Sequence, residues 1–337
     1  MLLQVQDLRV AFRTEGGIGA AVDGVSFGVG AGETVALVGE SGCGKSVTAL
    51  SILRLLPSPP ARLEGGSIRF DGRELTTMPL PELRRLRGGD IGMVFQEPMT
   101  ALNPVLTVGA QLAEAIRLHQ PVTRAAARGQ AAALLDMVRI PDAARHLDEY
   151  PHRLSGGMRQ RVVIAMALAC GPRLLIADEP TTALDVTIQA GILDLLRGVQ
   201  ARTGMALLLI THNLGVVADM ADRVVVMYAG RVAEQGPTRD VLRAPRHPYT
   251  QGMLAATLRL PHRSGAGGTP LREIPGMVPA LTAMPPGCAF APRCRMAEPA
   301  CTGAHRHCST LARDTSPHAR RSFAWPRHDG RIARIDG

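Results

Sequence analysis

The sequence predicts an α/β fold built on a largely parallel sheet with helices on both of its faces. Two observations predict it. Short apolar runs typical of strands alternate with stretches of helical spacing, and a glycine-rich loop lies between one such strand and one such helix. The 337 residues suffice for one large α/β domain and a smaller region, and the 46% apolar content supports a substantial core.

The expected strands are short apolar or alternating runs bounded by Gly, Pro or polar residues. They lie at residues 3–10, 21–29, 33–38, 67–70, 91–95, 174–177, 206–210 and 223–227. The expected helices, which carry apolar residues at helical spacing, lie at residues 46–56, 111–119 and 123–138. Pro57 ends the first of these helices, and Pro121 separates the other two.

The composition and the hydrophobic patterning of the chain change after about residue 260. A linker-like stretch, PHRSGAGGTP, is followed by sequence rich in Pro, Cys and Arg with little periodicity. We therefore expect a main domain at residues 1–260 and a C-terminal extension at residues 261–337.

The positive charge is concentrated at the C-terminal end. The formal net charge is +9, and the last 77 residues hold 11 Arg against 5 acidic residues, which accounts for +6 of it. Such a charge would suit a protein that binds nucleic acid, but only 3% of the residues are aromatic, so stacking platforms for bases are scarce.

The longest apolar run, residues 162–170, is far shorter than the ~20 residues of a membrane span, and no signal-peptide layout opens the chain. We expect a cytoplasmic protein that does not bind nucleic acid.

The glycine-rich loop fits the phosphate-loop pattern at every fixed position. It reads Gly39-x-x-x-x-Gly44-Lys45-Ser46, and Lys45 is the only Lys among 38 basic residues. Glycines let backbone N–H groups approach phosphate oxygens, the Lys reaches the β- and γ-phosphates, and the Ser hydroxyl suits Mg²⁺. The compact ammonium of Lys also fits inside a wrapped loop, whereas the planar guanidinium of Arg is wider and fits less well. The alternative is a chance glycine turn, and the strand-to-helix context argues against it.

Four further stretches follow the phosphate loop in the chain. They are FQEP around Gln96, LSGGMRQR at residues 154–161, LLIADEPTTALD at residues 174–185 and LITHN at residues 209–213. Each alone has a plain structural alternative: a surface amide, a helix N-cap, solvated acids at a strand end, and a core or surface His. Together they resemble the ATP-binding cassette (ABC) ATPases, because LSGGMRQR is the signature of that family.

The resemblance covers about residues 1–260. It implies a nucleotide-binding domain with a RecA-like parallel sheet core, an antiparallel β subdomain and a helical subdomain with the signature, inserted at residues 97–172. It also implies an active ATPase, in which Glu179 is the general base, His212 touches the γ-phosphate and Gln96 senses Mg²⁺ and relays the nucleotide state. The Mg²⁺ ligands implied are Ser46, Gln96 and Asp178.

The resemblance further implies that two cassettes pack head to tail with ATP between them. The signature Ser155 of one subunit then binds the γ-phosphate held by the other, and Asp185 crosses that interface. Phe12 matches the position of an aromatic that stacks on adenine, with core packing as the alternative. Asn213 departs from the family, which commonly has Asp there. The nucleotide contacts implied are Phe12, Gly39, Glu40, Ser41, Gly42, Cys43, Gly44, Lys45, Ser46, Val47, Ser155, Gly156, Gly157 and Asp185.

Three local strings resemble one group of ABC ATPases, those of oligopeptide and dipeptide importers. They are residues 97–104, residues 179–190 and the tail PRHPYTQGML at residues 245–254. The resemblance implies a peripheral subunit at the cytoplasmic face of the inner or plasma membrane. Its implied partners are a second, usually different ATPase chain, two membrane permeases and, indirectly, an extracytoplasmic substrate-binding protein.

Other functions stay open at this point. Related importers handle nickel or glutathione. A soluble ABC ATPase acting on nucleic acid or ribosomes is disfavoured, because such proteins usually carry two cassettes or a long coiled-coil insertion. A regulatory subunit without turnover is disfavoured by the presence of Glu179.

Four of the six Cys lie within 21 residues near the C-terminus. Cys288, Cys294, Cys301 and Cys308 are spaced C-x5-C-x6-C-x6-C. A reducing cytoplasm favours a metal over disulfides, but the C-x2–4-C knuckle usual for zinc is absent. We expect a 4Fe–4S cluster, which the resemblance to importer ATPases with this tail also implies, with zinc (His305 or His307 assisting) or free thiols as alternatives.

Overall fold

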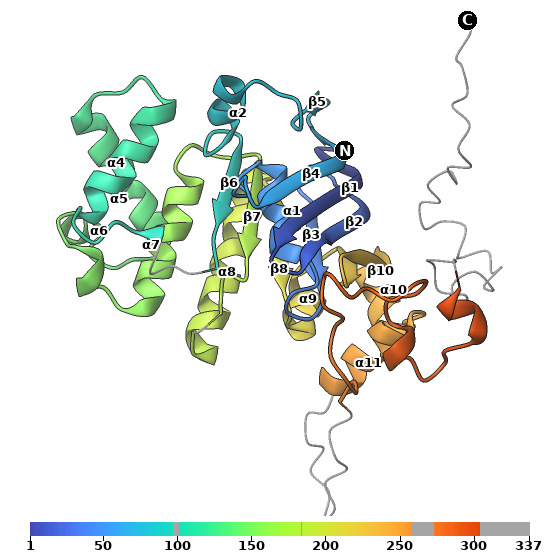
Figure 1. Cartoon of the computed structure of the whole chain (residues 1–337). Helices are drawn as coiled ribbons and strands as arrows, with labels where there is room; N and C mark the ends of the chain where they lie inside the picture. Colours follow the sequence, from blue (N-terminus) through green and yellow to red (C-terminus); the bar gives the residue numbers. More distant parts are fainter. Residues whose placement is uncertain (97–100, 183, 258–272, 304–337) are drawn as a thin grey trace, which may run out of the picture.

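Two sheets form the centre of the molecule (Figure 1). The computed structural model describes residues 1–96, 101–182, 184–257 and 273–303. Its strands are β1 (Leu3–Thr14), β2 (Gly17–Val29), β3 (Thr34–Val38), β4 (Ala61–Phe70), β5 (Arg73–Glu74), β6 (Ile91–Val94), β7 (Leu174–Asp178), β8 (Ala206–Thr211), β9 (Arg223–Tyr228) and β10 (Arg231–Pro237). Its α-helices are α1 (Lys45–Ile52), α2 (Leu80–Leu86), α4 (Val108–His119), α5 (Arg124–Met137), α6 (Ala143–His146), α7 (Gly156–Leu168), α8 (Val186–Thr203), α9 (Leu214–Met220), α10 (Thr238–Arg243) and α11 (Pro248–Thr257).

The larger sheet is mostly parallel, as predicted. Its strand order is β10-β9-β3-β8-β7-β6, and only β10 runs antiparallel to its neighbour. The smaller sheet, in the order β2-β1-β4-β5, is antiparallel. Because β3, β8, β7 and β6 are parallel neighbours, the loops that follow them leave from one edge of the sheet.

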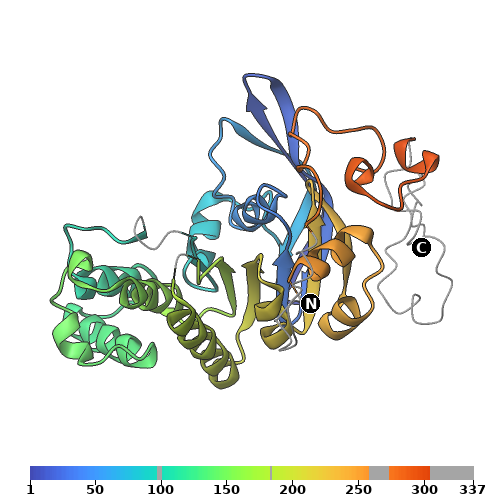
Figure 2. The same ribbon diagram turned by 90° about the horizontal axis from the view of Figure 1, so that it is seen from below.

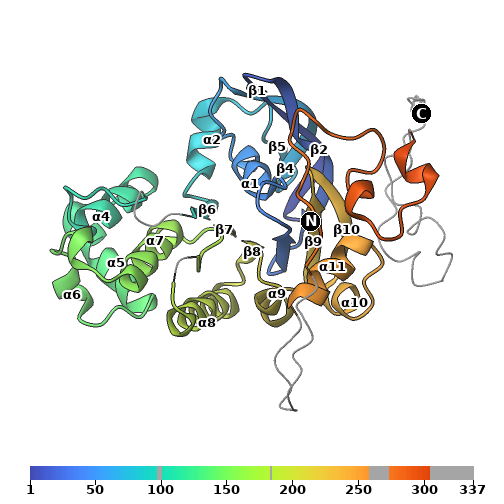
Figure 3. The same ribbon diagram turned by 60° about the horizontal axis from the view of Figure 1, so that its bottom comes forward.

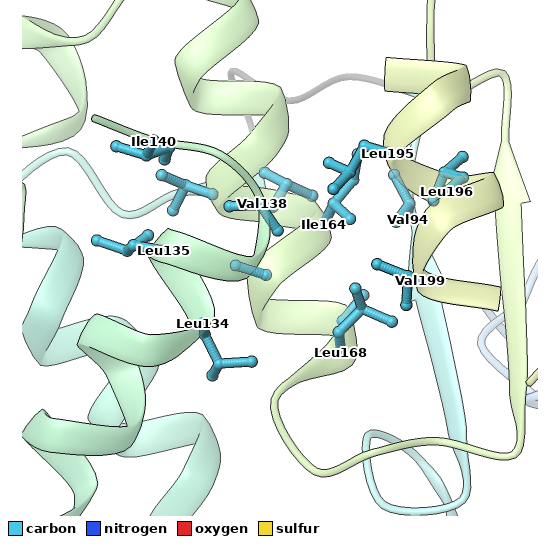
Figure 4. Close-up of a cluster of buried hydrophobic side chains, with 14 of the residues drawn as sticks. Val94, Leu134, Leu135, Val138, Ile140, Ile164, Leu168, Leu195, Leu196 and Val199 are labelled. Atoms are coloured by element: carbon cyan, nitrogen blue, oxygen red, sulfur yellow. The ribbon is translucent and has the colours of Figure 1, made fainter. Parts of the chain in front are cut away.

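The two faces of the larger sheet are buried in different hydrophobic clusters. On β7, Leu174 and Ile176 join the cluster formed with α1 and the smaller sheet. Leu175 and Ala177 point the other way, into a cluster formed with α5, α7 and α8, part of which is drawn in Figure 4. This period of two places helices on both faces, as predicted, with the smaller sheet adding a β layer to one of them.

The helix after the phosphate loop is shorter than predicted. We expected residues 46–56, whereas α1 ends at Ile52 and Arg54 adopts a left-handed conformation with φ of 50°. The Arg87 guanidinium donates hydrogen bonds to the carbonyl oxygens of Leu53, at 2.9 Å, and of Arg54, at 3.0 Å. These bonds satisfy carbonyl groups at the end of the helix, so the chain turns before Pro57 rather than at it.

Helices α4 to α7 lie between β6 and β7 in the chain, and Figures 1 and 3 show them grouped at one side of the sheets. Hydroxyl side chains cap three of them: those of Thr107, Thr123 and Ser155 accept backbone N–H bonds at the starts of α4, α5 and α7. Within the described residues, no helix has the length and apolar character needed to cross a bilayer.

The segment of residues 273–303, here called the C-terminal strap, is largely irregular, with two short 3₁₀ helices at Ala291–Arg293 and Pro299–Thr302. Figures 2 and 3 show it running from the edge of the larger sheet to the β1–β2 hairpin and back. Phe290 of the strap shares a hydrophobic cluster with Tyr228 of β9 and Tyr249 of α11. The strap therefore packs on the body of the molecule.

Candidate nucleotide site

The phosphate loop connects β3 to α1 with the geometry that its glycines permit. Gly39, Gly42 and Gly44 have φ values of 152°, 78° and 101°, which L side chains rarely adopt. A Cβ atom at Gly39 would overlap the carbonyl oxygen of Met227, and one at Gly44 would lie 2.6 Å from that of Ala21. Both glycines are therefore required by close backbone approach as well as by conformation.

Lys45 lies inside this loop and is only 5% exposed. Its ammonium donates hydrogen bonds to the carbonyl oxygens of Gly39, at 2.8 Å, and Glu40, at 3.0 Å. Cys43 beside it is fully buried, and burial raises the pKa of its thiol. Ser41 and Gly42 are exposed at the tip of the loop, while Val47 on α1 packs partly into the core.

Asp178 ends β7 next to the start of α1. Its side chain is buried, and burial raises its pKa, an effect opposed by a hydrogen bond from Ser46. Its Oδ1 atom is buried without a hydrogen-bond partner within the described part of the chain. A buried, unpaired carboxylate oxygen beside a Ser hydroxyl fits a divalent cation, because Mg²⁺ prefers oxygen ligands.

Glu179 is the meeting point of the residues predicted to carry the chemistry. Its Oε2 atom accepts hydrogen bonds from Gln96 Nε2, at 3.3 Å, and from the Thr182 hydroxyl, at 2.8 Å. Its Oε1 atom lies 3.4 Å from His212 Nδ1. Gln96 and His212 follow β6 and β8, so three neighbouring parallel strands deliver these side chains to one edge of the sheet.

The backbone at Glu179 is also unusual. It has φ of 47°, a value rare for a non-glycine residue, and its N–H donates to the carbonyl oxygen of Ile210 at 2.9 Å. Such conformations cost about 1–3 kcal/mol and cluster at functional sites. The two adjacent acids have different neighbours, because Asp178 accepts a hydrogen bond from Ser46 while Glu179 accepts hydrogen bonds from Gln96 and Thr182.

The signature residues lie apart from this group. Ser155 caps α7, and its hydroxyl accepts the N–H of Met158 at 3.3 Å. Among the residues described, no hydrogen bond joins Ser155, Gly156 or Gly157 to the phosphate loop. The start of α7 lies instead beside α8, because a Cβ at Gly157 would be 2.7 Å from the Cγ2 atom of Ile188.

Asp185 caps α8 and is exposed, and it accepts the N–H of Ile188 at 2.9 Å. One chain thus presents the start of its signature helix and its Asp185 side by side. Val186, the first residue of α8, is 82% exposed. The arrangement leaves both helix starts accessible to another molecule.

Two other predicted positions have mainly structural contacts. Phe12 on β1 is partly buried and packs against the core, opposite Gly19 in the β1–β2 pairing. Its proposed contact with adenine stays a prediction. Asn213 caps α9, and its side-chain oxygen accepts the N–H groups of Gly215 and Val216. That contact explains how Asn serves where the family commonly has Asp, because both side chains cap helices well.

Three of the four clustered cysteines lie in the C-terminal strap. The N–H of Cys288 donates to the carbonyl oxygen of Cys301 at 2.9 Å, and Cys294 lies between them in the chain. In residues 273–303 and the other described ranges, no three His, Cys, Asp or Glu side chains form a group able to hold a metal ion. Cys308, His305 and His307 lie outside the described residues.

Three contacts at the site were not predicted from sequence. Thr182 hydrogen-bonds Glu179, the Tyr249 hydroxyl accepts the N–H of Glu40 at 2.8 Å, and Arg293 forms an ion pair with the Glu40 carboxylate. Thr182 lies in the motif LLIADEPTTALD and Tyr249 in the motif PRHPYTQGML. Arg293 stands in the irregular strap, where no sequence pattern signals a contact with Glu40.

Comparisons with known proteins agree with this geometry. A family model described as "ABC transporter" matches residues 22–182, and one described as "Oligopeptide/dipeptide transporter, C-terminal region" matches residues 233–301. The chain is 54% identical over 331 residues to a putative peptide import ATP-binding protein of Brucella melitensis, covering 96% of this chain and 97% of that one. It is also 54% identical over 293 residues to the dipeptide transport ATP-binding protein DppD of Bacillus subtilis, covering 87% of this chain and 86% of that one.

Solved structures with the same fold include a dimeric post-hydrolysis state of an ATP-binding cassette bound to ADP and Pi. It is 28% identical, has a TM-score of 0.63, and covers 70% of this chain and 99% of that one. Another is cbiO1 from Clostridium perfringens, described as part of an ABC transporter complex, with 28% identity and a TM-score of 0.61, covering 72% of this chain and 91% of that one.

Proposed function

The chain belongs to the ATP-binding cassette transporter family, and we propose that it is the ATP-hydrolysing subunit that powers import of dipeptides or oligopeptides through a membrane ABC transporter. The peptide cargo is supported by relatives named as peptide import and dipeptide transport ATP-binding proteins, one of which matches almost the whole chain. The observation that carries the ATPase activity is the convergence of Gln96, Thr182 and His212 on Glu179.

Hydrolysis follows from the positions of these groups. Glu179 orients a water molecule and accepts its proton while the water oxygen bonds to the γ-phosphorus. The bond from that phosphorus to the β–γ bridging oxygen breaks, and ADP and phosphate leave. His212 and Gln96 hold the Glu179 carboxylate at the γ-phosphate end of the site, and Lys45 offsets the charge of the β- and γ-phosphates.

The residues for Mg²⁺ are Ser46, Asp178 and Gln96. The buried Oδ1 atom of Asp178 and its neighbour Ser46 support this assignment. When bound, the ion offsets phosphate charge and orients the phosphates. Asp178 would help to hold the ion, which leaves Glu179 to act on the attacking water.

The complete site needs two ATPase chains. Ser155 and the N–H groups of Gly156 and Gly157 stand at a helix start, a geometry that binds phosphate. Within the described residues they share no hydrogen bond with their own phosphate loop, and they lie beside the start of α8, where Asp185 is exposed. This supports a head-to-tail dimer with a second cassette, from a different chain. The other partners are two membrane permeases, which the chain meets from the cytoplasmic side of the membrane and which an extracytoplasmic binding protein supplies with peptide.

We propose further that Cys288, Cys294, Cys301 and Cys308 hold a 4Fe–4S cluster, with zinc as the alternative. Support comes from the gathering of four Cys within 21 residues and from the backbone bond between Cys288 and Cys301. The three described thiols form no ligand group in this structure, so no step of the reaction is assigned to a cluster. Iron and zinc analysis of the protein as purified tests this proposal, and a colourless protein with one zinc per chain would contradict the cluster.

Transport itself tests the proposed function. The tagged chain should co-purify from membranes with two polytopic proteins. That complex, reconstituted in liposomes with its binding protein, should take up labelled peptides only with ATP. Lys45→Ala should abolish uptake without dispersing the complex. Co-purification with ribosomes, or ATP turnover that moves no peptide, would overturn the proposal.

A further inference from the structure

Arg293 ties the C-terminal strap to the phosphate loop. Its Nη1 atom donates to Glu40 Oε2 at 2.8 Å and its Nη2 atom to Glu40 Oε1 at 3.2 Å. This two-point pairing joins residues 253 positions apart, and the Arg293 side chain is only 7% exposed. Parallel Arg–carboxylate bonds of this kind fix geometry as well as adding energy.

Backbone carbonyl groups of the strap also bind the Arg293 guanidinium. Its Nε atom donates to the carbonyl oxygen of Pro275 at 2.8 Å and Nη2 to that of Ile274 at 3.2 Å. Nη1 also donates to the Tyr228 hydroxyl at 3.3 Å. Every nitrogen of the guanidinium therefore has a partner, and Arg293 has little freedom to turn away from Glu40.

Glu40 is the second residue of the phosphate loop, and three of its groups are held. Arg293 binds its carboxylate, Tyr249 accepts its N–H at 2.8 Å, and its carbonyl oxygen accepts the Lys45 ammonium at 3.0 Å. The same carbonyl accepts the N–H of Cys43 at 3.3 Å. A displacement of Glu40 would therefore move both Lys45 and the turn that forms the phosphate cradle.

These contacts lie against a group of packed aromatic rings. The rings of Tyr228, Tyr249 and Phe290 pack together, with centroids 4.7 to 5.4 Å apart, and Tyr249 is fully buried. The Arg293 guanidinium lies 5.8 Å from the centre of the Tyr228 ring. Packed aromatic rings attract one another beyond the effect of burial alone, so they stabilise the position from which the strap presents Arg293 to Glu40.

We propose that Arg293 is a positioning residue of the nucleotide site, which holds Glu40 and through it the phosphate loop in the conformation that binds Mg-ATP. The inference rests on the proposed function, because it assigns the loop to ATP. A glycine-rich loop is conformationally free, and fixing it beforehand lowers the cost of binding. Arg293 also offsets the charge of Glu40, which would otherwise repel the phosphates.

The test is equilibrium binding of a ribose-labelled fluorescent ATP, with Mg²⁺, to the full chain. Arg293→Met should raise the Kd about tenfold, the scale of one charge-assisted hydrogen bond. Arg295→Met is the matched control, because Arg295 is exposed on the same strap and lies on the other side of Cys294. Its Kd should equal that of the wild type, which separates the Glu40 contact from a change of charge beside the cysteines.

Two further measurements separate positioning from folding. Arg293→Lys keeps the positive charge but cannot pair with the carboxylate at two points, so its affinity for ATP should lie between those of Arg293→Met and the wild type. In the assembled transporter, Arg293→Met should raise the KM for ATP while changing kcat less than about twofold, because Arg293 touches no reacting group. In a Glu40→Gln background, Arg293→Met should have less than about a threefold effect on the Kd, since the two residues act as one unit.

The outcomes distinguish a failure of the proposed function from a failure of the positioning role of Arg293. Lys45→Ala with wild-type affinity would mean that the loop is not the ATP site, and the proposed function would fail. Loss of binding in Lys45→Ala together with wild-type affinity in Arg293→Met and Arg293→Lys would overturn the positioning role alone. Equal loss in Arg293→Met and Arg295→Met would overturn it too. Far-ultraviolet circular dichroism on each variant checks that the fold is kept.

Discussion

Nδ1 of His212 lies 3.4 Å from Oε1 of Glu179, although the two residues follow different strands, β8 and β7. The other oxygen of the same carboxylate accepts hydrogen bonds from Thr182 and Gln96. Glu179 thus accepts hydrogen bonds on one oxygen and has the His212 ring beside the other, and these three neighbours come from three loops at the edge where the phosphate loop also begins.

The first prediction concerns Glu179 itself. Glu179→Gln keeps the size of the side chain and removes its ability to accept a proton. The ATPase rate of the assembled transporter should fall about 10²–10⁴-fold, the usual contribution of a general base. Affinity for Mg-ATP should be unchanged, because Lys45 and the loop are intact. Equal ATPase rates for the variant and the wild type would show that Glu179 is not the base.

Thr182 gives a second prediction. Its hydroxyl donates to Glu179 at 2.8 Å, so Thr182→Val should let the carboxylate turn and lower kcat about ten- to a hundredfold, the scale of one hydrogen bond to a charged group. The KM for ATP should not change. In a Glu179→Gln background, Thr182→Val should lower the rate by less than about twofold, and a full additional loss there would mean that Thr182 acts on something else.

The contact between the strap and the β1–β2 hairpin gives a third prediction. A Cβ at Gly19 would lie 2.6 Å from Leu281 Cβ and 2.9 Å from its carbonyl carbon, so Gly19→Ala must displace the strap. The free energy of unfolding should fall by about 1–3 kcal/mol, the usual cost of overpacking. Protease cleavage within residues 273–303 should become faster.

Gly16→Ala is the control for that substitution. Gly16 lies in the turn of the same hairpin, but its new Cβ would be 3.8 Å from the nearest atoms of Thr282, which is ordinary contact. Its stability and cleavage rate should match those of the wild type. If both variants behave alike, the hairpin and the strap are not in the contact described.

Buried His247 makes stability depend on pH. Burial lowers its pKa from 6.5 to about 4, and its Nδ1 atom accepts the N–H of Tyr249 at 3.1 Å. Because the unfolded chain binds the proton more readily, the contribution of neutral His247 is complete above pH 6.5 and is lost as the pH falls to about 4. The loss should be about 3 kcal/mol.

Denaturant unfolding of the wild type and of His247→Asn measures this contribution. Asn offers an acceptor to the Tyr249 N–H but has no proton to bind in this range. Between about pH 7 and about pH 4 the wild type should lose about 3 kcal/mol more stability than the variant. Parallel pH profiles for the two proteins would contradict the assignment.

The gathering of the proposed site residues at one edge of the sheet could be predicted from the sequence, because parallel strands end together, whereas their roles in catalysis stay predictions. Lys45, Gln96, Asp178 and His212 each follow a recognisable strand, and adjacent parallel strands end at one edge. The β1–β2 pairing and the early end of α1 at Ile52 were harder to predict from the sequence. The latter depends on Arg87, which lies 34 residues from Leu53 and carries no local signal.

The strap shows where sequence reasoning reaches its limit. Arg293 meets Glu40, and Leu281 meets Gly19, across more than 250 residues of chain. Neither segment has a period of 2 or 3.6 from which a face could be inferred, and an Arg in a segment rich in Arg gives no reason to choose one partner. These contacts follow from tertiary packing around Tyr228, Tyr249 and Phe290.

The most direct measurement is the structure of the assembled transporter carrying Glu179→Gln with Mg-ATP bound. The account predicts a closed pair of ATPase subunits, in which the nucleotide on Lys45 lies against the signature helix of the other subunit. Ser155 should lie within hydrogen-bond distance of the γ-phosphate held by that other subunit. A closed assembly in which Ser155 reaches neither γ-phosphate would contradict the account.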